Sequence, residues 1–168
     1  NKLSYYYFNG YQVKKDYKKS LMWSIKSANN GNLASMFNVG YHYYNGYAGK
    51  VDYDLAFEWY KRAADKMFPK ALNALGSMYY RGEGVEKNIT LAYEYTLQSA
   101  GLLHTYSLSN MGVMIDELEL DQDSSIWYRL AAKNYTMPSS SNSILYDKLL
   151  AGENIIGMDY KIDSDSIP

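Results

Sequence analysis

The chain repeats itself every 36 residues, and this periodicity restricts the folds that it can adopt. Six columns of the self-alignment keep the same or a similar residue through three consecutive units: Tyr7, Tyr43 and Tyr79; Gly10, Gly46 and Gly82; Asp16, Asp52 and Asn88; Trp23, Trp59 and Tyr95; Ala28, Ala64 and Ala100; Gly40, Gly76 and Gly112. A repeat of this length indicates a stack of small supersecondary units that bury their apolar surface mainly against their neighbours.

The first half of each unit is predicted to be a helix. In the third unit Ala71, Leu75 and Tyr79 recur at intervals of four residues, which places them on one helical face. Gly76 interrupts this helix, where glycine costs about 1 kcal/mol relative to alanine. Its recurrence therefore indicates that another helix crosses it closely. The glycines of residues 82–84 then end the helix.

A second helix follows in each unit. Asn88 is a good N-cap residue, as are Asp16 and Asp52 in the two units before it. We expect the second helix of the third unit to run to Ala100 and to be stopped by Gly101. Each unit is thus predicted to be a pair of antiparallel helices.

This pattern resembles the Sel1-like repeat family, a TPR-like group. The resemblance rests on ALNALGSMYYRGEGVEKNITLAYEYTLQSAG (71–101) and DLAFEWYKRAAD (54–65), which carry a Leu-Gly pair, a tyrosine, a Gly-x-Gly-Val turn and an aromatic helix. It implies an all-α, right-handed superhelical solenoid of antiparallel helix pairs. The chain departs from the family pattern at Met67 and Pro69, at residues 102–104, and in the fourth unit, where Asp116-Glu117-Leu118-Glu119 replaces the glycine turn.

The solenoid is expected to cover residues 1–134, with units at about 1–31, 32–67, 68–103 and 104–134. The fourth unit reaches its Trp127-Tyr128 pair four residues early. Residues 135–168 do not follow the repeat, and the serines and proline of residues 136–143 indicate a loop. Residues 144–150 could form one short helix that caps the last unit, because a solenoid has to cover its exposed end.

Composition excludes several kinds of chemistry. The chain has no cysteine, so it has no disulfide, thiolate metal site or cysteine nucleophile. Its net charge of −1 disfavours a nucleic-acid partner, although six lysines and one acid give residues 1–26 a charge of +5. Ten acids and four bases give residues 116–168 a charge of −6. No apolar run approaches the roughly 18 residues that a membrane span requires.

No catalytic residue, metal site or cofactor is predicted. The two histidines, His42 and His104, fall in different units, and each is expected on a helix surface or in a turn. The glycine turn at residues 82–84 lacks the further glycines or the Lys-Ser/Thr pair of a phosphate loop. The acidic run of residues 116–123 is interpreted as a solvated loop. Counted from Asp121, Ala132 stands where an EF-hand requires glutamate.

The expected binding surface is the concave face of the solenoid, which the first helices of the units usually line. Side chains that point away from the core there form a ladder from aromatic through polar to acidic residues. The ladder consists of Phe37, Tyr41 and Tyr44 in the second unit; Asn73, Ser77 and Tyr80 in the third; and Ser109, Val113 and Asp116 in the fourth. Exposed aromatic side chains are natural anchors, so a peptide or helix of a partner protein is expected to dock along the ladder.

The resemblance implies a protein–protein interaction adaptor or scaffold, because Sel1-like proteins assemble multiprotein complexes. One branch serves endoplasmic-reticulum-associated degradation, and others are bacterial signalling or secreted host-interaction proteins. Three alternatives stay open: a constitutive structural subunit of a large assembly, an adaptor of the endoplasmic-reticulum-associated degradation branch, and a hydrolase-like Sel1 repeat protein, for which no nucleophile and base can be named. The compartment and the use of the glycosylation sequons at Asn88 and Asn134 cannot be assigned from the sequence.

Overall fold

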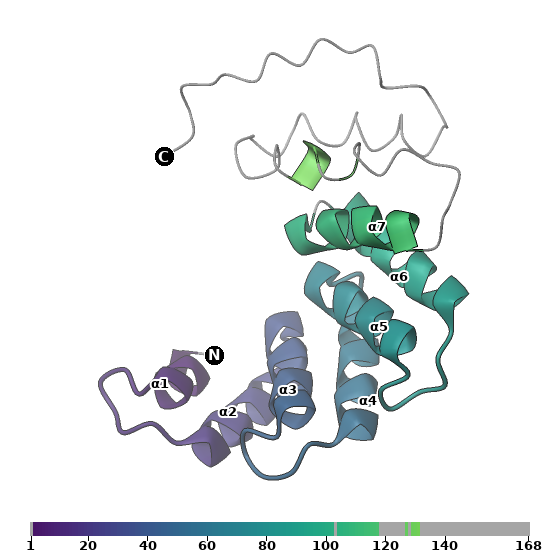
Figure 1. Ribbon diagram of the computed structural model, residues 1–168. Coiled ribbons are helices and arrows are strands. Elements are labelled where there is room, and N and C mark those ends of the chain that lie inside the picture. The colour runs from purple at the N-terminus through teal and green to yellow at the C-terminus, as the bar shows by residue number, and fades with distance from the viewer. Residues whose placement is uncertain (1, 103, 118–126, 128, 132–168) are drawn as a thin grey trace, which may run out of the picture.

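The computed structural model describes residues 2–102, 104–117, 127 and 129–131, and over these ranges the regular structure is entirely helical. The helices are α1 (Lys2–Asn9), α2 (Tyr17–Asn29), α3 (Leu33–Asn45), α4 (Tyr53–Ala64), α5 (Pro69–Arg81), α6 (Ile89–Gly101) and α7 (Thr105–Glu117). Each helix packs on the next along the chain. They form an arc with α3, α5 and α7 along its inner side and α4 and α6 along its outer side (Figure 1).

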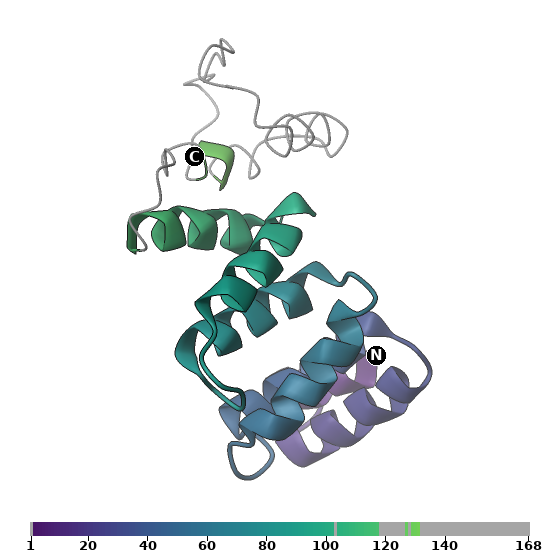
Figure 2. The ribbon, with the colours of Figure 1, turned by 90° about the vertical axis from the view of Figure 1, so that its right-hand side faces the viewer.

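The helix pairs turn relative to one another along the arc, as the view toward its outer side shows (Figure 2). The predicted all-α solenoid of antiparallel helix pairs is therefore confirmed. Residues 118–126 and 132–168 lie outside the described residues. The loop at 136–143, the capping helix at 144–150 and the sequon at Asn134 consequently stay predictions, as does the division of the chain at residue 134.

Polar caps begin the second helix of each of the first three units, as predicted. The Oδ1 atoms of Asp16, Asp52 and Asn88 accept hydrogen bonds from the backbone N–H three residues later, at 2.9–3.0 Å. Gly46 and Gly82 end α3 and α5 with left-handed φ angles of 66° and 72°, which a glycine adopts without strain. Caps at both ends of the inter-helix turns hold each pair antiparallel.

Recurring glycines let the two helices of a pair approach closely. A Cβ added to Gly40 on α3 would lie 2.7 Å from the ring of Tyr60 on α4. A Cβ added to Gly76 on α5 would contact Thr96 Oγ1 and lie 3.1 Å from the carbonyl oxygen of Ala92, both on α6. The close crossing predicted from the recurring glycine is confirmed at both positions.

The core runs along the arc as two clusters of buried side chains. The first joins α2 to α5, and its largest fully buried members include Leu72, Leu75 and Met78. The second joins α6 to the described part of the fourth unit and consists of Ala100, Leu108, Met111, Ile115, Trp127 and Ala131. Trp127 and Ala131 thus cover α7 from the position that a second helix of the fourth unit would occupy.

His42 is buried, so the prediction that it lies on a helix surface or in a turn is wrong. The side chain is 2% exposed, because α1 folds over α2 and brings Phe8 to 5.4 Å from the imidazole centroid. Its Nε2 lies 3.0 Å from Ser20 Oγ, which in turn donates to the backbone oxygen of Ser4 at 3.0 Å. Burial lowers the pKa of His42 to about 4, because the charged imidazolium would lose its hydration.

Candidate binding surface

The nine ladder residues lie on α3, α5 and α7, the helices along the inner side of the arc (Figure 1). None of the nine is buried: Tyr41, Val113 and Asp116 are exposed, and the others are half-buried. In contrast, Val39 on α3 and Leu75 on α5 are fully buried. On α3, however, Phe37 and Tyr44 also pack against the first core cluster, so these two ladder residues do not point away from the core as predicted.

Tyr41 is the most exposed aromatic residue of the ladder. Its ring is 38% exposed and lies nearly parallel to Phe37, with centroids 6.2 Å apart. Tyr47 and Phe8 contact its other sides at 5.6 Å and 6.3 Å. A side-chain hydrogen bond with Tyr47 raises the pKa of Tyr41, so the phenol stays neutral near neutral pH. The ring is thus held by its neighbours while part of it remains open to a partner.

Tyr44 is used mainly to join consecutive units. Its hydroxyl donates to Glu83 Oε2 at 2.7 Å and accepts from Arg81 Nη1 at 2.9 Å, so it ties α3 to the end of α5 and the turn that follows. Its ring also packs on Tyr53 at 5.2 Å. Burial is the largest cause that raises the pKa of Tyr44. A partner would therefore meet the edge of a fixed side chain here.

The polar part of the ladder also takes part in unit-to-unit contacts. Asn73 Oδ1 accepts hydrogen bonds from Ser107 Oγ and Asn110 Nδ2, both at 2.9 Å, which join α5 to α7. Lys87 lies over the ring of Tyr80 at 5.6 Å. Ser77 and Ser109 are half-buried at this end of the ladder, and Val113 and Asp116 are exposed.

Two exposed tyrosines belong with the ladder although the sequence prediction did not include them. Tyr5 on α1 is 61% exposed and stands 36 residues before Tyr41. Tyr106 on α7 is 67% exposed and lies two helical turns before Val113, on the same helical face. Tyr5 could have been predicted from the sequence, because positions 5, 41, 77 and 113 are each separated by the repeat length of 36 residues.

Chemistry beyond binding finds little support in the described residues. Ser20 and His42 have the separation of a nucleophile and its base, but Ser20 is 0% exposed and no substrate could reach it. His104 lies in the turn before α7, as predicted, with its Nδ1 2.9 Å from Ser107 Oγ. Across the described ranges, no three His, Asp or Glu side chains gather as a metal site would require. None of the described helices is long and apolar enough to cross a membrane.

Comparison with solved structures supports the same fold. A Sel1 repeat protein from Oxalobacter formigenes is 22% identical, with a TM-score of 0.74 over 90% of this chain and 70% of that protein. A protective antigen of uropathogenic Escherichia coli strains, c5321, which displays an SLR fold, is 27% identical with a TM-score of 0.71. The match covers 89% of this chain but only 32% of the antigen.

Comparison by sequence is more specific. No curated protein was found to be significantly similar to the chain. The pattern that describes the Sel1 repeat, however, matches three successive segments, residues 1–32, 33–66 and 69–102. These segments contain α1–α2, α3–α4 and α5–α6, so each match is one of the helix pairs described above. With more than half of its length accounted for in this way, the chain belongs to the Sel1 repeat family.

Proposed function

We propose that the chain is a protein–protein interaction adaptor whose inner surface receives a peptide or a helix of a partner protein. Sel1 repeats are generally protein-interaction modules, and this fold is typically a non-catalytic scaffold. The observation that carries the proposal is Tyr41, an exposed ring fixed by aromatic neighbours on the inner side of the arc. An anchor that is already fixed loses little side-chain entropy when a partner binds.

The inner surface offers a graded set of contacts along the position series 5, 41, 77 and 113. Tyr5 and Tyr41 are exposed aromatic residues, Ser77 is small and half-buried, and Val113 is 43% exposed and apolar. Large aromatic side chains contribute most of the binding energy at protein interfaces, whereas the surrounding contacts mainly exclude water. Within this position series we therefore expect Tyr5 and Tyr41 to contribute most of the affinity and positions 77 and 113 to contribute shape. Tyr106, outside the series, adds a third exposed ring at the α7 end.

The test is recovery of partners by the tagged chain and its variants, followed by affinity measurement with the partner that is identified. Tyr5→Ala and Tyr41→Ala are the test variants, and Met22→Ala on α2, which removes a side chain that is 54% exposed, is the matched control. Loss of an aromatic anchor is expected to weaken binding about 30-fold, whereas the control should change it little. Equal recovery by all three variants, each shown to be folded by circular dichroism, would contradict the proposal.

A constitutive subunit of a larger assembly is the second candidate. The charge of +5 on residues 1–26 and of −6 on residues 116–168 favours it, because opposite ends of this kind can specify fixed neighbours. Co-purification with fixed stoichiometry that survives high salt would favour the subunit. Recovery that depends on salt and varies in stoichiometry would favour the adaptor.

A further inference from the structure

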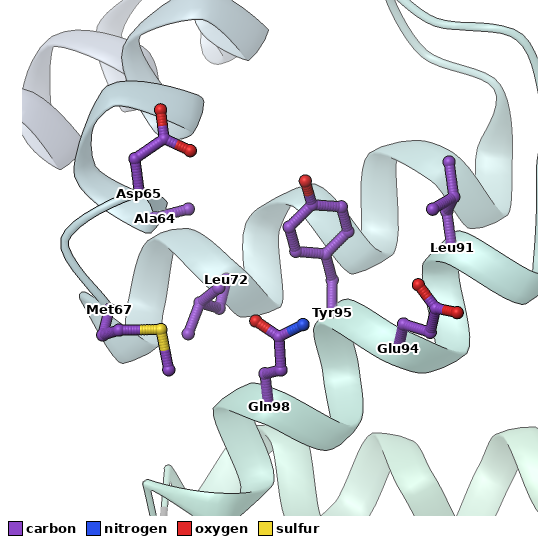
Figure 3. Close-up of a pocket in the computed structure, with 8 residues that line it drawn as sticks. All are labelled: Ala64, Asp65, Met67, Leu72, Leu91, Glu94, Tyr95 and Gln98. Atoms are coloured by element: carbon purple, nitrogen blue, oxygen red, sulfur yellow. The ribbon is translucent and has the colours of Figure 1, made fainter.

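A groove of about 260 Å³ lies between α4 and α6, the two helices on the outer side of the arc (Figure 3). Leu72 of α5, Leu91 of α6 and Met67 of the α4–α5 turn provide its apolar lining. The ring of Tyr95 stands in the middle of the groove, between the residues of α6 and those of the turn. This volume is close to the lower limit of ordinary ligand sites and suits a single long side chain.

The repeat explains why the groove is open in the third unit. In the two preceding units, the aromatic residue at this position is covered by a cation from three residues further along the same helix. Lys26 Nζ lies 5.1 Å from the Trp23 ring centroid, and Arg62 Cζ lies 4.1 Å from the Trp59 ring centroid.

The third unit keeps the aromatic residue but loses the cation. Tyr95 stands 36 residues after Trp59, and the neutral Gln98 stands 36 residues after Arg62. An aromatic ring attracts a cation through the negative potential of its face. Tyr79 stacks on one face of the Tyr95 ring, with centroids 5.6 Å apart, so a cation can approach only the opposite face. The third unit has no cation at position 98 to cover that face.

The charges around the groove favour a cationic occupant. Asp65 and Glu94 lie on its rim. Asp65 is paired with Lys61 at 3.2 Å, which leaves Glu94 as the carboxylate with no ion pair to another described residue. Gln98 adds an amide oxygen that can accept a hydrogen bond. Glu94 is therefore the rim carboxylate with which a cationic occupant could pair.

We propose that this groove binds an arginine side chain of a partner protein. The guanidinium would lie against Tyr95 and pair with Glu94, while the methylene stem would pack on Leu72 and Leu91. Arginine suits the site better than lysine because its planar guanidinium stacks on aromatic rings and donates several hydrogen bonds in a fixed arrangement. The groove would supply in trans the contact that Arg62 makes within the second unit. It lies on the outer side of the arc and does not depend on the inner surface.

The experiment titrates the full isotope-labelled chain with N-acetyl-arginine amide, and in parallel with N-acetyl-citrulline amide, its neutral isostere. We expect the arginine probe to shift the NMR signals of the Leu91 methyls, the Met67 methyl and the Tyr95 ring, with an affinity at least about fivefold above that of citrulline. Glu94→Gln should weaken binding by a similar factor, whereas Glu58→Gln, its counterpart 36 residues earlier, should not.

Two further variants test whether a cationic side chain of the chain itself decides if the groove can bind the arginine probe. Gln98→Arg should cover Tyr95 in cis and abolish binding, and Arg62→Gln should open a second site beside Trp59. The proposal is overturned if the arginine probe leaves the groove signals unmoved or if citrulline binds equally well. It is equally overturned if Gln98→Arg still binds, or if Arg62→Gln gains no site while the chain remains folded.

Discussion

Replacing Gly76 by alanine should separate α5 from α6, because the glycine is needed for the close crossing of these helices. The added Cβ would contact Thr96 Oγ1 and lie 3.1 Å from the Ala92 oxygen and 3.3 Å from the Thr96 nitrogen. Two of these three atoms belong to the backbone of α6, so no side-chain rotation can relieve those two contacts. Overpacking at the upper end of its range, about 2–3 kcal/mol, is offset by about 1 kcal/mol of helix propensity. The net loss is therefore about 1–2 kcal/mol.

Thermal and urea unfolding followed by circular dichroism would measure this loss. For a chain of this length it corresponds to a decrease in Tm of about 2–8 °C. Gly49→Ala is the matched control, because nothing lies within 4 Å of the Cβ that it would add. We expect that variant to be as stable as the parent or slightly more stable, since alanine reduces the freedom of the unfolded chain.

A double-mutant cycle with Thr96→Ala then tests the cause. Removing the hydroxyl eliminates the most severe contact of the new Cβ but leaves the two backbone contacts in place. Gly76→Ala should therefore cost about 1 kcal/mol less in the Thr96→Ala background than in the parent. The reasoning would be refuted if Gly76→Ala were as stable as the parent, or if its cost were the same in both backgrounds.

Three further perturbations are expected to report on the caps, the buried histidine and the link between units. Asp52→Ala should lower the free energy of unfolding by about 1 kcal/mol in urea titrations, through loss of the N-cap bond to α4. Because the pKa of His42 is about 4 in the folded state against 6.5 in the unfolded state, the unfolded chain takes up the proton first as pH falls. The contribution of His42 to stability is thus complete above about pH 7 and should fall by about 2–3 kcal/mol between about pH 7 and 4.5, a slope that His42→Gln should flatten. Tyr44→Phe should cost about 1 kcal/mol by removing the bonds to Glu83 and Arg81, and an unchanged unfolding midpoint would show that these bonds do not stabilise the fold.

The sequence predicts the helix pairs well because the residues that define them act over short distances. The caps at Asp16, Asp52 and Asn88 bond to a backbone group three residues away, so their role is visible within one unit. The end of α6 is a small exception. The helix includes Gly101 and is capped by Leu102, because Gly101 does not adopt the left-handed conformation that ends α3 and α5.

Burial of His42 could not be read from its chemical character, since histidine is as common on surfaces as inside. The contacts that bury it include Phe8 of α1 and Ser20 of α2, both more than twenty residues earlier in the chain. The repeat nevertheless carried a signal. The positions 36 and 72 residues later are Met78 and Met114, which are 0% and 6% exposed. In a repeat protein, the column of the self-alignment predicts burial better than the residue type does.

The candidate surface was predictable in outline but not in its contacts. All nine ladder residues are accessible at least in part, although Phe37 and Tyr44 also pack against the core. It does not show that Tyr44 is bound by Glu83 or that Asn73 is bound by Ser107, because these bonds join different units. Contacts between units depend on how far each pair turns relative to the next, which no pattern within one unit records.

Departures from the repeat are where binding properties can differ between units without loss of the fold. The recurring glycines are constrained by helix crossings. Other repeat positions differ between units: Ser77 stands 36 residues after Tyr41, and Gln98 stands 36 residues after Arg62. The first change confines the exposed aromatic anchors of this series to α1 and α3, and the second leaves the outer groove open in the third unit. An adaptor has to hold two partners at once, which requires surfaces that do not compete. A solenoid meets this requirement because each unit contacts only its neighbours, so an inner site near one end and an outer site further along can be occupied independently.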